Sequence, residues 1–155
     1  KPTIDACKNG ESALAGKQLE PAQQQFAAAL KHAPRDYAAN LRMGQTLQAM
    51  GRAGDASRFV QTAREVYPQE AQAMKLGATL KLGLRDPAGA YADLQAYDRV
   101  LPGDAGVLFL KGVALEGQGQ RQAAAQHYAG FLRVTQQGQA AQYSASRLKS
   151  WGYLK

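Results

Sequence analysis

The sequence has few of the residues on which disulfide-linked, metal-binding or catalytic proteins depend. Its 155 residues include one cysteine, Cys7, and two histidines, His32 and His127, which are far apart in the chain. A single cysteine excludes an internal disulfide, and no base stands beside it to activate the thiol. No His-Glu-x-x-His or Cys-x-x-Cys sequence is present, so we expect no metal centre and no cofactor.

Long apolar runs and a leader are also missing. No apolar stretch approaches the roughly 20 residues that a transmembrane helix requires, so no transmembrane segment is expected. A charged start followed by an apolar leader is absent as well. The sequence begins Lys1-Pro2 without an initiator methionine. We therefore expect a processed mature chain or a segment of a longer protein.

Glycine is common, with 16 residues, but no glycine lies in a recognisable phosphate loop. The glycine turns at 51–55 and 117–121 lack the lysine and the flanking strand of a nucleotide site. Asp93 and Asp98 stand five residues apart, a spacing that does not bring two carboxylates onto one helix face. We expect a chain that is not itself an enzyme, which leaves room for a catalytic domain elsewhere in a longer parent protein.

What the sequence does contain is a repeat. Proline recurs with a period of about 34 residues, at Pro34, Pro68 and Pro102. Self-similarity at such a period is typical of stacked helical repeats. Three further rows run through four copies: Ala22, Ala56, Ala90 and Ala124; Gly10, Gly44, Gly77 and Gly112; and Phe26, Val60, Leu94 and Tyr128.

The glycine row is the uneven one. The interval from Gly44 to Gly77 is one position shorter than the interval from Gly10 to Gly44, and the interval from Gly77 to Gly112 is one position longer. We attribute this to one residue added in the turn at 82–89 of the third copy. Asp86-Pro87 in that turn reads as a helix cap followed by a proline at the first helical position, which would restart the pattern.

Each copy contains two helix-length patterns around a turn, and from Thr3 to Gln136 the sequence resembles the tetratricopeptide repeat family. The tryptophan common in the first helix of that family is absent. The resemblance implies an all-α fold, a right-handed α-solenoid of four helix pairs in a single domain over 3–155. The repeats are expected at about 3–36, 37–69, 70–103 and 104–136, and a capping helix with a polar outer side at about 139–151.

The resemblance also implies a concave groove lined by the first helix of each pair. Residues two and three before the row glycine, and the residue after it, should face this groove. Three repeats then place a cation beside an apolar row, which suits a peptide with apolar anchors and acidic groups, bound extended or as a helix. The alternative is a solvated charged face above apolar inter-repeat packing. The predicted groove residues are Lys8, Leu41, Arg42, Gln45, Met74, Lys75, Ala78, Phe109 and Val113.

The charge of the chain permits several partners. A formal charge of +7 and a pI of about 9.7 are compatible with an acidic protein, nucleic acid or an anionic membrane surface. Arginines such as Arg52 and Arg133 could contact phosphates. The aromatic residues, however, fall on helix-packing rows and form no stacking platform. A protein–protein interaction module is therefore favoured, and a basic nucleic-acid-binding repeat is the less favoured alternative.

The Ala- and Gln-rich, degenerate repeats are similar in style to the repeat tails of bacterial envelope proteins. These include assembly lipoproteins and periplasmic zinc metalloproteases, in which the tail is a non-catalytic C-terminal domain. This style favours envelope assembly or quality control in the bacterial periplasm or envelope, with the cytoplasm as the alternative. Trp151, Tyr153 and Leu154 could also join two copies into a homodimer through the capping helix.

Overall fold

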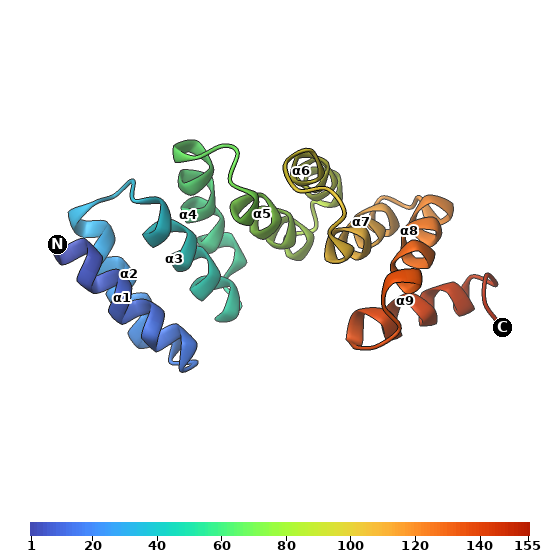
Figure 1. The fold of residues 1–155 in the computed structure, drawn as a ribbon, viewed down its shortest axis with the longest axis horizontal. Helices are drawn as coiled ribbons and strands as arrows, with labels where there is room; N and C mark the ends of the chain where they lie inside the picture. Colours follow the sequence, from blue (N-terminus) through green and yellow to red (C-terminus); the bar gives the residue numbers. More distant parts are fainter. The chain divides into compact units, whose positions relative to one another are not determined.

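The computed structural model describes all 155 residues as nine α-helices without a strand (Figure 1). The all-α class is therefore confirmed, and each expected repeat contains two helices. None of the helices combines the length and the apolarity needed to cross a bilayer. In chain order they are α1 (Pro2–Ala15), α2 (Leu19–His32), α3 (Tyr37–Ala49), α4 (Ala53–Val66), α5 (Ala71–Gly83), α6 (Pro87–Val100), α7 (Ala105–Gly117), α8 (Arg121–Val134) and α9 (Gln139–Ser150).

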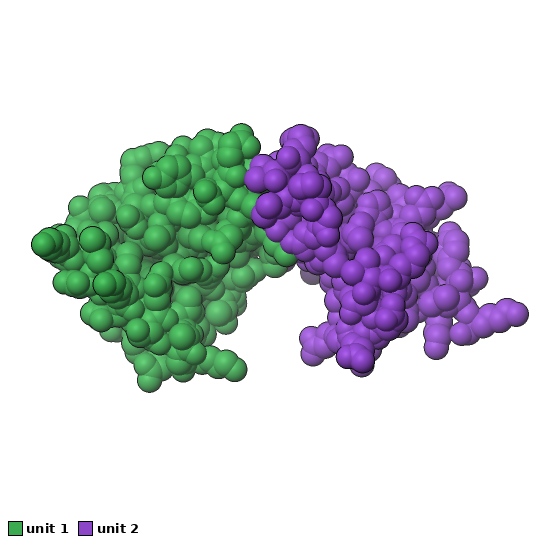
Figure 2. Space-filling view, viewed as in Figure 1, with its two compact units in different colours: residues 1–80 green, residues 81–155 purple.

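The chain forms two compact units, Lys1–Leu80 and Lys81–Lys155 (Figure 2). Unit 1 contains α1 to α4 and most of α5, and unit 2 contains the end of α5 and α6 to α9. That residues 3–155 work as a single repeat domain stays a prediction.

Aspartate side chains begin three of the helices. Asp36 accepts a hydrogen bond from the Ala39 amide at the start of α3 (2.9 Å), and Asp86 accepts one from the Gly89 amide at the start of α6 (3.0 Å). Asp104 caps α7 in the same way. Such caps satisfy backbone donors that the first helical turn leaves without a partner. The expected cap at Asp86, followed by Pro87 in the first turn, is confirmed.

The five odd-numbered helices all end in one kind of turn. Shortly after each helix end, one residue adopts a left-handed conformation, with φ between 58° and 84°. The next amide then donates back to a carbonyl five residues earlier, which closes the helix end. These donor–acceptor pairs are Gln18–Ala13, Arg52–Leu47, Asp86–Lys81, Gln120–Leu115 and Tyr153–Leu148, at 2.8–2.9 Å.

The shared turn shows that α9 is built like the first helix of a fifth pair. Its exposed residues include the polar Gln142, Ser146 and Lys149 but also Tyr143, which is 42% exposed, and a terminal helix of a stack requires a polar outer side. The helix predicted as a cap thus combines a largely polar outer side with the turn of a first helix.

The third repeat keeps the period of its neighbours, so the expected insertion in its turn is wrong. The helices α3, α5 and α7 begin at Tyr37, Ala71 and Ala105, which are evenly spaced along the chain. The left-handed turn residues Gly51 and Arg85 show the same spacing. No residue has been added between the two helices of this repeat.

The small-residue row lies one position later in α5 than the sequence pattern predicted. Ala78, and not Gly77, lies midway between Gly44 and Gly112 in the sequence, and Ala78 is fully buried. The sequence misled because Gly77 and Ala78 are adjacent and both small, so either could have filled the row.

The small row lets the two helices of a pair approach closely. A Cβ atom built on Gly44 would lie 2.6 Å from Cγ2 of Val60, and one on Gly10 would lie 2.6 Å from the Phe26 ring. Such distances are shorter than van der Waals contact, so a side chain at Gly44 or Gly10 would require Val60, Phe26 or the helices themselves to shift.

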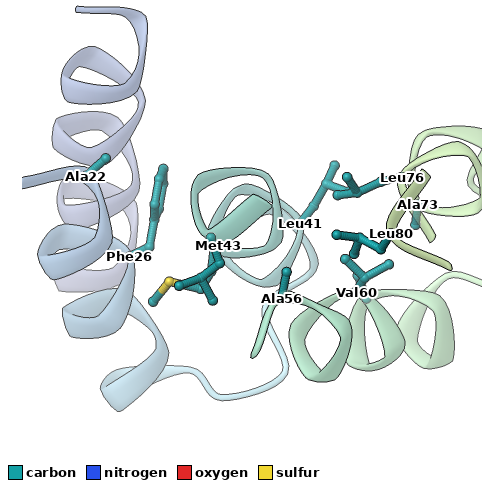
Figure 3. Packing of buried hydrophobic residues seen from close by; sticks show 11 residues of the cluster. Ala22, Phe26, Leu41, Met43, Ala56, Val60, Ala73, Leu76 and Leu80 are labelled. Atoms are coloured by element: carbon teal, nitrogen blue, oxygen red, sulfur yellow. The ribbon is translucent and has the colours of Figure 1, made fainter. Parts of the chain in front are cut away.

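The core of unit 1 lies on both sides of α3 (Figure 3). Phe26 of α2 faces Met43 of α3, whereas Leu41 projects from the other side of α3 toward Leu76 of α5. These four side chains are 0–8% exposed. Helix α3 is therefore covered from two directions, which explains why seven of its 13 residues are buried.

Unit 2 replaces one apolar contact of the repeat with an ion pair. In the corrected register Lys81 occupies the row of Leu47 and Leu115, and Asp93 is the counterpart of Phe59 in the preceding repeat. Lys81 Nζ lies 2.8 Å from Asp93 Oδ2, and the Asp93 residue is only 6% exposed. A carboxylate so buried depends on a cation close by.

Gly44→Ala is expected to lower the free energy of unfolding by about 1–3 kcal/mol, because the new Cβ meets the buried, β-branched Val60. Gly54→Ala in α4 is the matched control: no heavy atom lies within 4 Å of its Cβ position. That change should raise stability by roughly 0.4–1 kcal/mol through the unfolded chain. Urea unfolding followed by circular dichroism measures both, and equal effects would contradict the close-contact explanation.

Lys81→Leu is expected to lower the free energy of unfolding by about 2 kcal/mol, because it leaves Asp93 buried without this cation. The double variant Lys81→Leu with Asp93→Phe restores the residue types of the second repeat, and should recover stability to within about 1 kcal/mol of the wild type. Urea unfolding of the two variants tests this. A single variant as stable as the wild type would show that the pair does not support the fold.

Candidate peptide-binding surface

The first helices of unit 1 bring a cation and a carboxylate together. Arg42 Nε on α3 lies 3.5 Å from Glu11 Oε1 on α1, and Arg42 Nη1 donates to Gln45 Oε1 at 2.8 Å. The Arg42 and Glu11 side chains are 33% and 47% exposed. Exposed pairs of this kind contribute about 0–1 kcal/mol, so Arg42 can exchange Glu11 for another carboxylate at little cost.

Lys8 and Arg42 are counterparts in successive repeats, and Lys8 is exposed. Lys75 does not continue this row. In the corrected register the counterpart of Arg42 on α5 is Leu76, which is 8% exposed, while Lys75 is the counterpart of Leu41. The predicted row of three equivalent cations is therefore wrong, and two of them remain.

Three predicted groove residues are part of the core and do not form an open apolar floor. Leu41 is 2% exposed, Met74 is 4% exposed and Ala78 is fully buried. The physical reason is the two-sided packing of the first helices: Leu41 points toward Leu76 of the next first helix (Figure 3). These side chains present almost no surface to a ligand.

Phe109 and Val113 of α7 are half-buried and pack against the core of unit 2. The Phe109 ring centroid lies 5.5 Å from that of Phe131 and 5.9 Å from those of Tyr128 and Tyr143. Tilted and edge-to-face contacts at such distances stabilise aromatic clusters. Phe109 thus joins α7, α8 and α9.

A polar network around Glu116 was not predicted. The Tyr128 hydroxyl donates to Glu116 Oε1 at 2.8 Å, the Tyr143 hydroxyl donates to the same oxygen at 3.3 Å, and Arg147 Nη2 lies 2.8 Å from Oε2. Burial, followed by the hydrogen bond to Glu116, raises the pKa of Tyr128 well above its ordinary value. The one available signal was Tyr128 itself, because a tyrosine in a buried row needs an acceptor.

Two cavities lie in unit 2 beside the first half of α8 and the C-terminal end of α9. One has a volume of about 320 Å³, and the other a volume of about 200 Å³. Glu116, Gly119, Arg121, Arg147 and Trp151 line the smaller cavity. The larger is lined by two glutamines of α8 and by Ala125, Ala129, Leu148, Tyr153 and Leu154.

Cys7 is half-buried beside Ala6, Ala29 and Ala39. Burial, and then the charges of Asp36 and Glu11, raise the pKa of its thiol. A protonated thiol is a poor nucleophile, so the surroundings of Cys7 do not activate it. No group of three or more His, Cys, Asp or Glu side chains is placed to hold a metal ion.

The comparisons with known proteins agree with the repeat. The family profile for the tetratricopeptide repeat matches residues 13–80. The fold of MamA from Desulfovibrio magneticus RS-1 matches with a TM-score of 0.83 and 15% identity, over 97% of this chain and 93% of that chain. Residues 13–80 thus match the tetratricopeptide repeat family in sequence, and the whole chain has the fold of these repeat proteins.

Further tetratricopeptide structures share the fold of this repeat protein. A thermophilic protein from Thermus thermophilus matches with a TM-score of 0.78 and 18% identity, over 97% of this chain and 84% of that one. A protein from Parabacteroides merdae ATCC 43184 matches with a TM-score of 0.78 and 16% identity, over 96% and 59% of the two chains. A search of curated proteins gives no match. The tetratricopeptide fold indicates a protein–protein interaction scaffold.

A second tyrosine–carboxylate pair gives this tetratricopeptide protein a pH-dependent contact. The Tyr97 hydroxyl at the end of α6 donates to Asp104 Oδ2 at 2.6 Å. This hydrogen bond, then burial, then the charges of Asp104 and Asp98 raise the pKa of Tyr97 from 10.0 to about 12. Because the folded pKa lies above the unfolded one, the stabilisation is complete below pH 10.0 and is lost as the pH rises through about 12.

We therefore expect the stability of the wild type to fall over this pH window more steeply than that of Tyr97→Phe, which has no hydroxyl to ionise. Urea unfolding at a series of alkaline pH values measures the difference, and tyrosinate absorbance reports the titration directly. Equal slopes in the two proteins would show that Tyr97 does not hold its proton through Asp104.

Proposed function

We propose that the first-helix surface of unit 1 binds an acidic segment of a partner protein, with Lys8 and Arg42 as its cations. The contact between Arg42 and Glu11 carries this proposal. It supports the proposal because the Glu11 carboxylate already lies 3.5 Å from the Arg42 guanidinium, so a carboxylate of a ligand can bind at the same place.

Arg42 is suited to this role by its geometry. Its planar guanidinium can donate two parallel hydrogen bonds to one carboxylate. Gln45 accepts a hydrogen bond from Arg42 Nη1 at 2.8 Å, which holds the guanidinium in one orientation while Nε lies 3.5 Å from Glu11 Oε1. Lys8, one repeat earlier, provides a point charge for a second acidic residue of the ligand.

The burial of Leu41 and Met74 makes this surface less suited to apolar side chains of a ligand than the sequence predicted. With those side chains 2% and 4% exposed, apolar anchors find little surface at these positions, so the acidic groups dominate recognition here. Lys75, which is half-buried, lies one position away from the cation row. Lys75→Glu is therefore expected to weaken binding less than Arg42→Glu does.

The double variant Lys8→Glu with Arg42→Glu is expected to weaken the binding of a fluorescein-labelled glutamate-rich peptide about tenfold or more, because two attractive contacts become repulsive. The matched control is Lys31→Glu with Arg58→Glu. It changes the net charge of the protein by the same amount, but on α2 and α4. Fluorescence anisotropy at physiological salt gives both dissociation constants.

Two further measurements distinguish a specific acidic-peptide site from general attraction to negative charge. Glu11→Gln should strengthen binding a few-fold, because it removes the carboxylate that competes for Arg42. Equal losses in the two double variants would show that the peptide responds only to net charge. Displacement of the peptide by duplex DNA of random sequence at physiological salt would favour the nucleic-acid alternative.

A further inference from the structure

The last residues of the chain hold two apolar side chains at the surface of unit 2. Tyr153 is 53% exposed and Leu154 is 43% exposed. Their amides donate to the Leu148 carbonyl at 2.8 Å and 3.3 Å, after a left-handed Gly152 with φ of 84°. The turn therefore fixes both residues at the end of α9.

An apolar side chain at this place is a departure from the repeat. The residues that make the same backbone hydrogen bond at the other four turns are all polar or charged. Tyrosine is thus not required by the turn, and together with Leu154 it forms an exposed apolar patch at the cavity of unit 2. The four counterparts of Tyr153 are Gln18, Arg52, Asp86 and Gln120.

Beside these residues lies the cavity of about 320 Å³, a volume at the lower end of ligand sites. One wall is made by Ala125 and Ala129 of α8. The counterparts of Ala129 are the exposed glutamines Gln61 and Gln95 in α4 and α6, and the alanine Ala27 in α2. The small alanine of α8 leaves room for a side chain from outside.

The segment that builds most of this cavity has side-chain charge of one sign, and Glu116 of α7 is the carboxylate that pairs with it, at Arg147. From Arg121 to Lys155 the sequence contains five lysines and arginines and no aspartate or glutamate. The smaller cavity, of about 200 Å³, is lined by Arg121 of α8 and Arg147 of α9. These two residues directly precede Gln122 and Leu148, which line the larger cavity. The guanidinium carbons of Arg121 and Arg147 lie 5.4 Å and 4.9 Å from the ring centroid of Trp151.

We propose that this end of unit 2 is a second binding site, which takes an acidic peptide of a partner protein. A large apolar side chain of the peptide enters the cavity between Ala129, Leu148 and Leu154, and flanking carboxylates face Arg121 and the other cations of the segment. The site goes beyond the surface proposed on α1 and α3, since it uses other helices and needs an apolar anchor.

Three short peptides test the chemistry of the site. The first consists of glutamates around a central Leu-Phe pair, the second has lysines in place of the glutamates, and the third has Ala-Ala in place of Leu-Phe. Trp151 is the one tryptophan of the chain, so its fluorescence reports binding at this end. The first peptide is expected to bind at least about tenfold more tightly than either of the others.

Variants of the protein locate the site. Ala129→Glu places a carboxylate in the cavity wall and should weaken binding of the first peptide about tenfold or more. Ala27→Glu, at the counterpart position on α2, is the matched control and should leave binding unchanged. Tyr153→Ser with Leu154→Ser changes only exposed side chains, so it should reduce binding without loss of the fold, which thermal melting verifies.

Several outcomes would overturn the proposal. One is binding of the first peptide that neither Ala129→Glu nor the double serine variant weakens. Another is the absence of any Trp151 response to the first peptide. Self-association in sedimentation experiments that the double serine variant abolishes would identify the site as an interface between two copies. The variant Lys8→Glu with Arg42→Glu should leave the Trp151 response intact, which keeps this test separate from that of unit 1.

Discussion

The close approach of two helices at a small residue is the constraint on which the rest of the structure depends. At Gly44 and Gly112 a Cβ atom would lie 2.6 Å from Val60 and from the Tyr128 ring, respectively. This contact sets the distance between the helices of a pair, and thereby decides which residues on either side can be buried. Leu47, three residues after Gly44, then reaches the core as a consequence of the same register.

Most of the fold could be predicted because its signals are local. Prolines, aspartate caps and apolar rows mark where helices begin and end, and these depend on a few neighbouring residues. The third repeat could not be aligned in this way, because Gly77 and Ala78 are both small enough for the contact. Only the helix bounds and the turn at Arg85 distinguish the two.

The candidate site was harder to predict than the fold. An apolar residue three positions before the small row can line a groove or pack between first helices, and the sequence pattern is the same for both. Burial at Leu41 follows from its contact with the next repeat, which periodicity does not describe. The network around Glu116 was missed for a similar reason, since Arg147 and Tyr128 meet it from different helices.

The distribution of charge separates cations that support the fold from cations available to a partner. Lys81 and Lys111 are paired with Asp93 and Asp98 inside unit 2, and such pairs mainly offset the cost of burying charge. The segment from Arg121 to Lys155 has no carboxylate side chain of its own, and within it only Arg147 forms a salt bridge, with Glu116. Because repulsion among like charges on one surface is unfavourable for the free chain, an acidic partner there relieves it and gains affinity from the relief. The cations of the two proposed sites thus belong to the part of the net positive charge that no buried ion pair uses.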